Sequence, residues 1–302
     1  AGLVLGPGGL VSAEGVLAAG DEAGIYEALG LAFIIPELRE GLGEVEAAAQ
    51  GRLPRSLEAE EVRGCLHVHS HYSDGVNSLE ELAAEAQRRG WEFLGISDHS
   101  QSAYYAGGLK PPDLERQRRD LAACQARFPG VRLFWGIEAD ILGDGSLDYP
   151  DEVLREFDFV IASVHSQFQQ SREAMTRRLL AAMANPWCTM VGHVSGRLLL
   201  AREGYELDLE AVLAMAGREQ VIMELNASPY RLDLDWRWLK QAKELGVLIS
   251  INPDAHNLEG LDDVDFGVLT ARKGWLEARD VINTYSPAEV AGLLARRRGA
   301  GG

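Results

Sequence analysis

The chain has 302 residues, a length that suits two small domains or one α/β barrel, and its composition is 46% hydrophobic and 25% charged, as in ordinary globular proteins. It contains no apolar run near the roughly 20 residues of a membrane span, and residues 1–10 lack the features of a signal peptide. A net charge of −17 opposes sequence-independent binding to nucleic acid, which depends on Lys and Arg contacts to phosphate. Three widely spaced cysteines cannot form a disulfide framework, so we expect a protein of the reducing cytoplasm.

The first part of the chain, residues 1–58, is predicted to be a separate segment. An apolar and aromatic cluster covers residues 25–38, and an acidic stretch at residues 40–50 predicts a short helix. Residues 51–56 then have the composition of a linker.

Residues 59–302 repeat one unit, in which a short apolar run is followed by a polar loop and an amphipathic helix. This period predicts parallel strands joined by helices. The clearest helix covers residues 78–89, where Ser78 and Glu81 suit a capping box and Gly90 suits the left-handed backbone of a helix end. Seven strands are expected, over residues 62–68, 93–97, 131–137, 159–164, 189–192, 221–225 and 247–251. The pattern predicts an α/β barrel.

Six of the seven histidines lie in or just after one of these predicted strands, and three carboxylates complete the set. In an α/β barrel the loops after the strands converge on one face, so these side chains are expected to meet. Imidazole and carboxylate ligands together suit zinc, manganese or iron, and nine candidates exceed what one ion can use. The expected ligands of two or three ions are His67, His69, Asp74, His99, Glu138, His165, His193, Asp254 and His256.

Each of these signals is weak when taken alone. A single His-x-His pair such as that of His67 and His69 often has no metal, Asp98 and His99 could be a helix cap, and Glu138 could be a salt-bridge partner at the barrel mouth. Nine such groups at one mouth would be costly to desolvate unless metal ions compensated them, so the joint pattern favours a metal site. The remaining histidine, His71, is predicted to be an exposed loop residue.

Residues 66–70 (LHVHS), 72–75 (YSDG) and 96–100 (ISDHS) strongly resemble the polymerase and histidinol phosphatase (PHP) superfamily, and further matches continue to residue 256. The resemblance implies a distorted (β/α)7 TIM-like barrel with a short N-terminal extension and a trinuclear metal site. It implies one ion held by His67, His69, Glu138 and Asp254, a second held by Glu138, His165 and His193, and a third held by Asp74, His99 and His256. Val194 departs from the family, in which Pro often follows the histidine.

The wider match is to the C-terminal PHP module of bacterial family X DNA polymerases. Residues 26–31 and 35–40 resemble the segment that joins the palm of those enzymes to the module, so residues 1–58 are interpreted as the end of a palm plus a linker. No DNA clamp and no paired palm aspartates precede residue 20, and Asp233 and Asp235 lie inside the barrel region. We expect no polymerase activity from this chain, and expect it to be a fragment or truncated descendant of a longer protein whose polymerase domains could act as a partner.

The resemblance implies a phosphoesterase that trims DNA 3′ ends, a 3′-5′ exonuclease, using three divalent ions, with Mn²⁺ preferred over Zn²⁺ or Fe. A hydroxide bridging the ions would attack the ester. One alternative is a small-molecule phosphatase of the histidinol phosphate type, which the acidic charge favours. A second is a non-catalytic structural module, but such a module should have lost ligands.

Roles follow for the remaining polar residues near the strand ends. Glu138 and Asp254 are expected to be catalytic as metal ligands, and Arg197 to clamp phosphate, with a salt bridge to Glu203 or its neighbours equally open. Asp98 is expected to orient a metal ligand. The expected substrate contacts, besides Arg197, are Asn226, Tyr104 and Tyr105.

Overall fold

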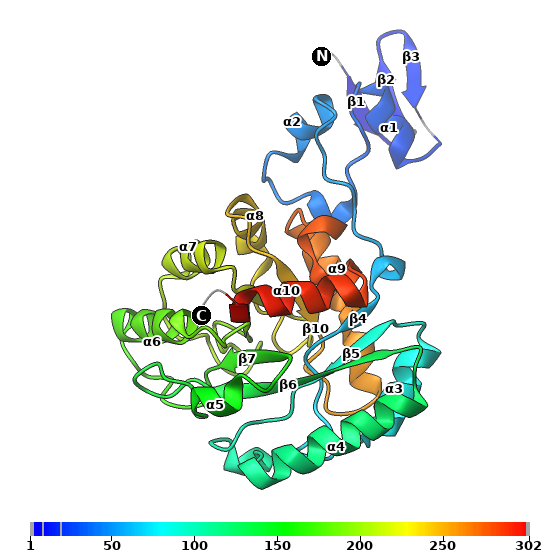
Figure 1. Cartoon of the computed structure of the whole chain (residues 1–302). Helices are drawn as coiled ribbons and strands as arrows, with labels where there is room; N and C mark the ends of the chain where they lie inside the picture. Colours follow the sequence, from blue (N-terminus) through cyan, green and yellow to red (C-terminus); the bar gives the residue numbers. More distant parts are fainter. Residues whose placement is uncertain (1–2, 8, 19, 300–302) are drawn as a thin grey trace. The chain divides into compact units, whose positions relative to one another are not determined.

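Two units make up the computed structural model, Ala1–Ser56 and Leu57–Gly302, and the structure describes residues 3–7, 9–18 and 20–299 (Figure 1). No helix among the described residues is long and apolar enough to span a bilayer.

The N-terminal unit contains a small antiparallel sheet that the sequence pattern did not predict. Its strands are β1 (Val4–Gly6), β2 (Gly9–Ser12) and β3 (Gly15–Ala18), each too short to show a clear alternation of apolar and polar residues. Helix α1 (Glu22–Ala28) follows, capped by the Asp21 carboxylate, which accepts a hydrogen bond from Gly24 N at 2.8 Å. After the 3-10 turn η1 (Pro36–Leu38), the helix expected at residues 40–50 forms as the shorter α2 (Glu44–Ala49).

The second unit is a sheet of seven parallel strands in chain order, which confirms the expected distorted (β/α)7 TIM-like barrel. The first and last strands meet at one parallel bridge between Val68 and Ala255, supported by a hydrogen bond from His69 N to Ala255 O at 2.9 Å. The distortion is local, because two of the strands have only two residues each. The strands are β4 (Gly64–Cys65), β5 (Phe93–Ile96), β6 (Arg132–Asp140), β7 (Phe159–Ser163), β8 (Met190–Val191), β9 (Ile222–Asn226) and β10 (Ile249–Asn252).

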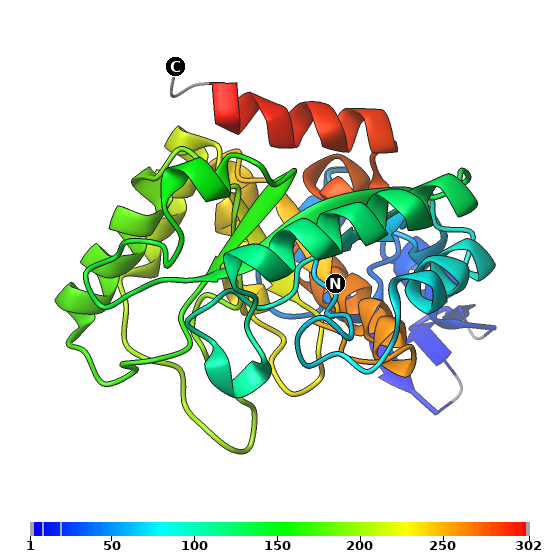
Figure 2. The same ribbon diagram turned by 60° about the horizontal axis from the view of Figure 1, so that its bottom comes forward.

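Helices lie on the outside of these strands (Figures 1 and 2). The predicted capping box is present in the first of them, where Ser78 Oγ accepts from Glu81 N at 3.2 Å and Glu81 Oε2 accepts from Ser78 N at 2.7 Å. The α-helices are α3 (Leu79–Arg88), α4 (Pro111–Arg127), α5 (Asp151–Leu154), α6 (Arg172–Ala184), α7 (Leu209–Glu219), α8 (Trp236–Glu244), α9 (Val264–Lys273) and α10 (Pro287–Gly299). The 3-10 turns are η2 (Ala59–Glu61), η3 (Tyr104–Ala106), η4 (Glu259–Asp263), η5 (Ala278–Asp280) and η6 (Ile282–Thr284).

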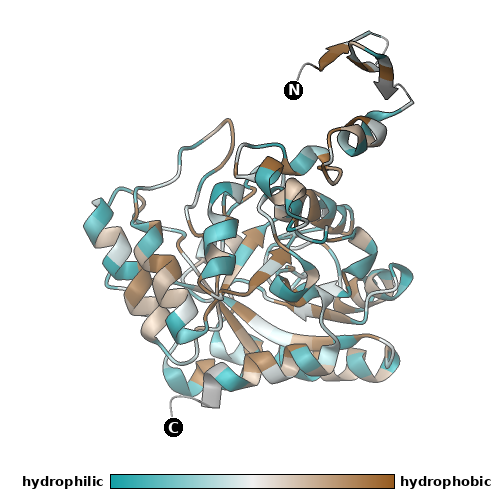
Figure 3. Ribbon diagram, turned by 90° about the horizontal axis from the view of Figure 1, so that it is seen from above, coloured by the Kyte–Doolittle hydropathy of each residue, from teal (hydrophilic) through white to brown (hydrophobic). Residues whose placement is uncertain are grey.

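The barrel interior changes from apolar to polar along the direction of the strands. Alternate residues of β6 share the inward face, and they run from Phe134 through Gly136 to Glu138 and Asp140. A Cβ atom at Gly136 would come within 2.2 Å of the Phe159 ring, so only glycine fits there. The hydropathy colouring in Figure 3 shows the largely apolar strands between the helices. An apolar cluster fills the end of the barrel where the strands begin, made of Leu66, Phe93, Phe134, Phe159, Ile161, Met190, Ile222, Ile282, Val290 and Leu294.

Two members of that cluster, Val290 and Leu294, belong to α10, so this helix closes the end of the barrel at which the strands begin. The polar inward positions therefore gather at the opposite end, where the strands finish and the long loops begin.

Candidate metal centre

All nine predicted ligands lie at the end of the barrel where the strands finish. Glu138 is part of β6, and the others follow β4, β5, β7, β8 and β10 in the chain. His67, His69, Glu138 and His193 are buried completely or nearly so, whereas Asp74 and His256 keep 35% and 40% of their side-chain surface exposed. The cluster thus has a buried floor and an accessible side.

Four side chains surround the most buried position. Asp254 Oδ1 lies 3.4 Å from His67 Nε2 and 3.1 Å from His69 Nε2. Glu138 Oε2 lies 3.4 Å and 3.7 Å from the same two nitrogens. Two imidazoles and two carboxylates therefore present ligand atoms to one small volume.

Glu138 turns its other oxygen toward two further histidines. Its Oε1 lies 3.2 Å from His165 Nε2 and 2.9 Å from His193 Nε2. Because each carboxylate oxygen faces a different pair of imidazoles, Glu138 has the geometry of a bridging ligand. His99 also approaches this carboxylate, with Nδ1 2.9 Å from Oε2.

A third group lies on the accessible side, around Asp74. Its carboxylate oxygens lie 3.3 Å from His256 Nε2 and 3.7 Å from His99 Nε2. Three overlapping sets have ligand atoms within 4.8 Å of one another, namely His69 with Asp74, His99 and His256, then His67 with His69 and Asp254, and then His99 with Glu138 and His165.

The donor atoms fit divalent metal ions. His67 Nε2 and Glu138 Oε2 are buried, and neither makes a hydrogen bond to any part of the chain that the structure describes. Leaving such groups unsatisfied costs free energy, which a bound cation would recover. Mixed imidazole and carboxylate donors suit transition metals such as zinc, manganese and iron.

Protonated histidines balance the carboxylates of the metal-free cluster. Burial acts to raise the pKa of Glu138, but the imidazoles of His165, His67 and His99 outweigh it and hold that pKa well below its ordinary value. Burial opposes protonation of His165, yet Glu138 and Asp140 raise its pKa to about 10. A metal ion must displace such protons to bind.

The pKa values of two other histidines shift in opposite directions. Burial acts against a charge on His256, but Asp74 and Asp254 raise its pKa to about 9. His69 differs, because burial and then the neighbouring imidazole of His99 lower its pKa to about 3 although Asp254 acts to raise it. It is therefore a neutral ligand already at neutral pH.

Two carboxylates that the sequence reasoning missed hold the far nitrogens of the histidines. Glu224 Oε1 accepts from His67 Nδ1 at 2.6 Å, and Asp140 Oδ1 accepts from His165 Nδ1 at 2.6 Å. Such bonds fix which ring nitrogen is free to bind a metal. The available signals were the single acid in the apolar run of β9, and the position of Asp140 two residues after Glu138 on the same strand face.

Asn226 and Asp98 both hold groups that belong to the cluster or to its loops. Asn226 is buried and donates from Nδ2 to Asp254 Oδ2 at 3.0 Å, so it holds a cluster carboxylate. Asp98 contacts no cluster histidine through a hydrogen bond among the described residues. Its carboxylate accepts from Ser70 N at 2.8 Å and from Ser73 N at 3.2 Å, and so shapes the loop that carries Asp74.

The donors of Arg197 are occupied by partners outside the cluster, which argues against its expected role as a phosphate clamp. Its Nε donates to Arg231 O at 2.8 Å, Nη1 pairs with Asp235 Oδ2 at 2.5 Å, and Nη2 donates to Leu232 O. A salt bridge was the alternative, but its partner is Asp235 and not Glu203. The arginine that reaches the cluster is Arg231, whose Nε lies 3.5 Å from Asp254 Oδ2.

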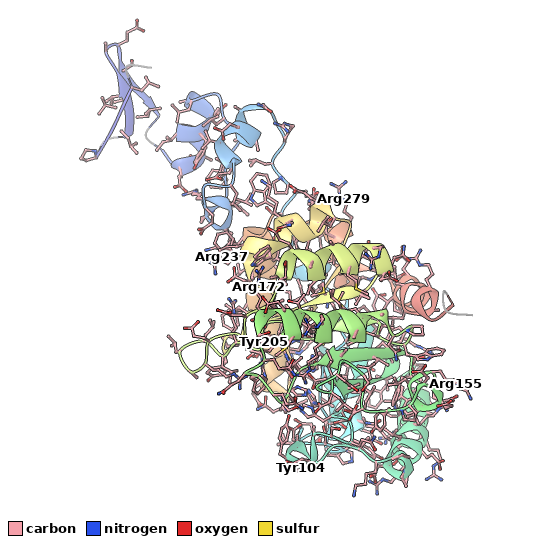
Figure 4. All side chains as sticks on the ribbon, turned by 90° about the vertical axis from the view of Figure 1, so that its left-hand side faces the viewer. Tyr104, Arg155, Arg172, Tyr205, Arg237 and Arg279 are labelled. Carbon is pink, nitrogen blue, oxygen red and sulfur yellow. The ribbon has the colours of Figure 1, made fainter. Side chains whose placement is uncertain are left out.

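The two predicted tyrosines lie in η3, in the loop after β5. The Tyr105 ring centroid lies 6.4 Å from that of His99, and burial together with Asp140, Glu138 and Asp74 raises its pKa. Tyr104 is 87% exposed and projects from the barrel unit at the end opposite Arg279 (Figure 4). His71 is exposed, as predicted, and lies outside the three ligand sets.

Comparisons with known proteins show which family the chain is related to. The chain is 42% identical over 275 residues to the DNA polymerase/3′-5′ exonuclease PolX of Bacillus subtilis, a match that covers 91% of this chain and 48% of that protein. It is 31% identical over 206 residues to a probable phosphatase of Caldicellulosiruptor saccharolyticus, covering 63% of this chain and 78% of that protein.

The chain therefore spans about half the length of the B. subtilis relative. The fold also matches the crystal structure of a proposed histidinol phosphatase from Listeria monocytogenes, with a TM-score of 0.51 and 14% identity over 66% of this chain and 97% of that one. The PHP domain model matches residues 66–228, which is more than half of the chain and includes seven of the nine cluster residues. With the sequence relationship to PolX, this match shows that the chain belongs to the PHP domain family.

Proposed function

We propose that this chain is a metal-dependent phosphoesterase that removes nucleotides from DNA 3′ ends. The observation that carries the proposal is the position of Glu138, whose two oxygens face separate pairs of histidines at the polar end of the barrel. This arrangement suits neighbouring cations, and neighbouring cations suit the hydrolysis of phosphate esters.

The ligands divide among three ions. His67, His69, Glu138 and Asp254 would hold one, Glu138 with His165 and His193 a second, and Asp74, His99 and His256 a third. Mn²⁺ is the proposed metal, and Zn²⁺ and Fe are the alternatives that the same donors accept. When bound, such ions lower the pKa of water and neutralise charge that develops on phosphoryl oxygens.

Residues outside the ligand set orient the histidine ligands and supply the proposed phosphate contact. Glu224 and Asp140 accept from the Nδ1 atoms of His67 and His165, which keeps the Nε2 atoms of both rings free. Arg231, which is 19% exposed and lies 3.5 Å from Asp254 Oδ2, is the proposed phosphate contact in place of Arg197. Arg197 in turn holds the carbonyl oxygen of Arg231 and so positions the turn that carries it.

DNA is proposed as the substrate because the PolX relative, which is named as a 3′-5′ exonuclease, matches 91% of this chain. Polymerase domains of a longer parent protein are the proposed partner. The acidic net charge of −17 and the matches to phosphatases favour a second candidate, a small-molecule phosphatase of the histidinol phosphate type. A structural module without activity is disfavoured, because all nine ligand positions hold competent residues.

Hydrolysis of a single-stranded oligonucleotide and of histidinol phosphate, each with Mn²⁺, separates the two enzyme candidates. The proposal expects release of nucleotides from the 3′ end. Removal of one cluster ligand in His193→Ala should lower the rate by roughly 100-fold or more, as loss of transition-state charge stabilisation does in other enzymes. The matched control is His71→Ala, which removes an exposed histidine outside the cluster and should retain full activity. Hydrolysis of histidinol phosphate alone would favour the second candidate.

A further inference from the structure

The end of the barrel that carries the cluster also carries most of the exposed large apolar side chains of the barrel unit. Seven of the ten such side chains that the structure describes in this unit lie in loops that follow strands. Solvent-exposed apolar groups gathered beside a polar site mark a contact surface. The seven are Val76, Tyr104, Tyr105, Leu142, Leu199, Leu200 and Tyr230.

Three of these side chains are tyrosines, and they belong to two loops that each carry a residue beside the cluster. Tyr104 and Tyr105 extend from the loop after β5, with ring centroids 6.2 Å apart and exposed fractions of 87% and 64%. Tyr230, which is 72% exposed, extends from the loop after β9 and directly precedes Arg231. Tyr105 neighbours His99, and Arg231 lies beside Asp254, so both tyrosine loops border the cluster.

Basic side chains are scarce on the same loops. The segments that follow the seven strands carry four Lys and Arg residues, namely Lys110, Arg197, Arg202 and Arg231. Of these, Arg197 donates to backbone carbonyl oxygens, and Arg202 donates to Gly196 O at 2.7 Å. Few cations are thus available to neutralise a row of phosphates, so a nucleic acid held here would depend on its bases.

We infer that Tyr104, Tyr105 and Tyr230 form a stacking platform that holds the unpaired bases of a single-stranded 3′ end while its terminal phosphodiester lies at the metal cluster. This inference rests on the proposed phosphoesterase function and names its substrate as single-stranded nucleic acid. Every base offers a flat face to a tyrosine ring, so the platform accepts any sequence. A base-paired end is excluded, because its bases already stack on one another.

The inference is tested with a 5′-labelled oligothymidylate and a small chromogenic phosphodiester, bis-p-nitrophenyl phosphate, both hydrolysed by the Mn²⁺-loaded chain. Replacement of a stacking tyrosine in Tyr105→Ala or Tyr230→Ala should raise KM for the oligonucleotide by roughly 10-fold, the usual loss when one base loses its aromatic partner. The KM for the chromogenic ester should rise less than that for the oligonucleotide in the same variants, because this short ester cannot extend from the cluster across both tyrosine loops. Tyr105→Phe should retain tight oligonucleotide binding, since the ring remains.

Phe266→Ala is the matched control. It removes an aromatic ring that is 46% exposed on α9, away from the loops that follow the strands, and should leave the KM for both substrates unchanged. Equal KM values for the oligonucleotide in the tyrosine variants and in this control would overturn the inference while leaving the phosphoesterase function intact.

Salt dependence gives a second readout that distinguishes stacking from phosphate contacts. Single-stranded binding weakens with salt by a slope of about −0.7 per neutralised phosphate, so two available cations predict a slope of about −1.4 in log affinity against log salt. Fluorescence anisotropy with a phosphorothioate oligothymidylate measures this slope. A slope steeper than about −3 would show that phosphate contacts dominate. Binding of the oligonucleotide without hydrolysis of either substrate would support the platform and remove the phosphoesterase proposal.

Discussion

Replacement of Glu224 by Gln tests whether a buried carboxylate outside the ligand set controls the metal centre. Glu224 Oε1 accepts from His67 Nδ1 at 2.6 Å and from Asn252 Nδ2 at 3.0 Å. Its Oε2 accepts from His193 N at 2.7 Å and from Asn226 Nδ2 at 3.3 Å. Both oxygens are therefore acceptors for at least two donors each.

A glutamine amide cannot satisfy this environment in either orientation. If its NH₂ group faces His193 N and Asn226 Nδ2, three donors meet without an acceptor. If it faces His67, the ring must accept at Nδ1 and carry its proton on Nε2, which is the nitrogen turned toward Glu138 and Asp254. The cluster would then lose a ligand atom without any change in its nine residues.

Loss of a carboxylate that orients a metal-ligating histidine usually costs 10- to 100-fold in metal affinity, or about 1.4 to 2.7 kcal/mol. Competition between Glu224→Gln and a fluorescent chelator for Mn²⁺ measures this affinity. Glu115→Gln, at an exposed position on α4, is the matched control and should bind metal like the unchanged chain. Equal metal affinity and stoichiometry in the two variants would refute the reasoning, provided circular dichroism shows both to be folded.

Further outcomes follow from the same contacts. Mn²⁺ binding near neutral pH should release protons and tighten as pH rises, because the metal-free His165 and His256 have pKa values of about 10 and 9. Calorimetry in two buffers of different ionisation enthalpy measures the number of protons released. In the chelated protein these raised pKa values contribute stability that is complete below the unfolded pKa of about 6.5 and is lost as pH rises through 9 to 10, so urea midpoints should fall over that window. Gly136→Ala should destabilise the barrel by about 1 to 3 kcal/mol, since the new methyl group overlaps the Phe159 ring; thermal unfolding beside the unchanged chain measures the loss. Addition of a chelator should lower the melting temperature, because ligands that bind only the folded state stabilise it.

Much of the barrel was predictable because short stretches of sequence carry the patterns that specify its strands and helices. The alternation of apolar runs and amphipathic helices gave seven parallel strands, and the Ser78 capping box marked the start of α3. The position of the histidines at strand ends indicated that they would meet, since a parallel barrel brings these ends to one face. The bounds were less accurate at β4 and β8, where the ladder has only two residues; after β4 the side chains of Asn252 and Ser97 accept from the backbone N–H groups of Leu66 and Val68.

The contacts that could not be predicted depend on partners distant in the chain. Arg197 had the composition of a phosphate clamp, but its donors are taken by carbonyl oxygens 34 and 35 residues away. Asn226 faces Asp254, 28 residues later, and no local pattern marks this pairing. The strands of the N-terminal sheet have three or four residues each, too few for a periodic signal to emerge.

The residues that pack the barrel and the residues of the cluster lie on the same strands, two steps of alternation apart on β6. On β6 the inward face begins with Phe134, which belongs to the apolar cluster that α10 covers. It continues through Gly136 to Glu138, which belongs to the histidine and carboxylate cluster. The cluster end gains little from apolar burial, because its inward positions are histidines and acids that need cations or protons to be tolerated. The apolar end must therefore supply much of the packing free energy that keeps the strand ends in register, and cations held by the cluster would add stability beside the bridge between Val68 and Ala255. Helix α10 contributes Val290 and Leu294 to that apolar end, so the last helix of the chain supports the packing at the end opposite the chemistry.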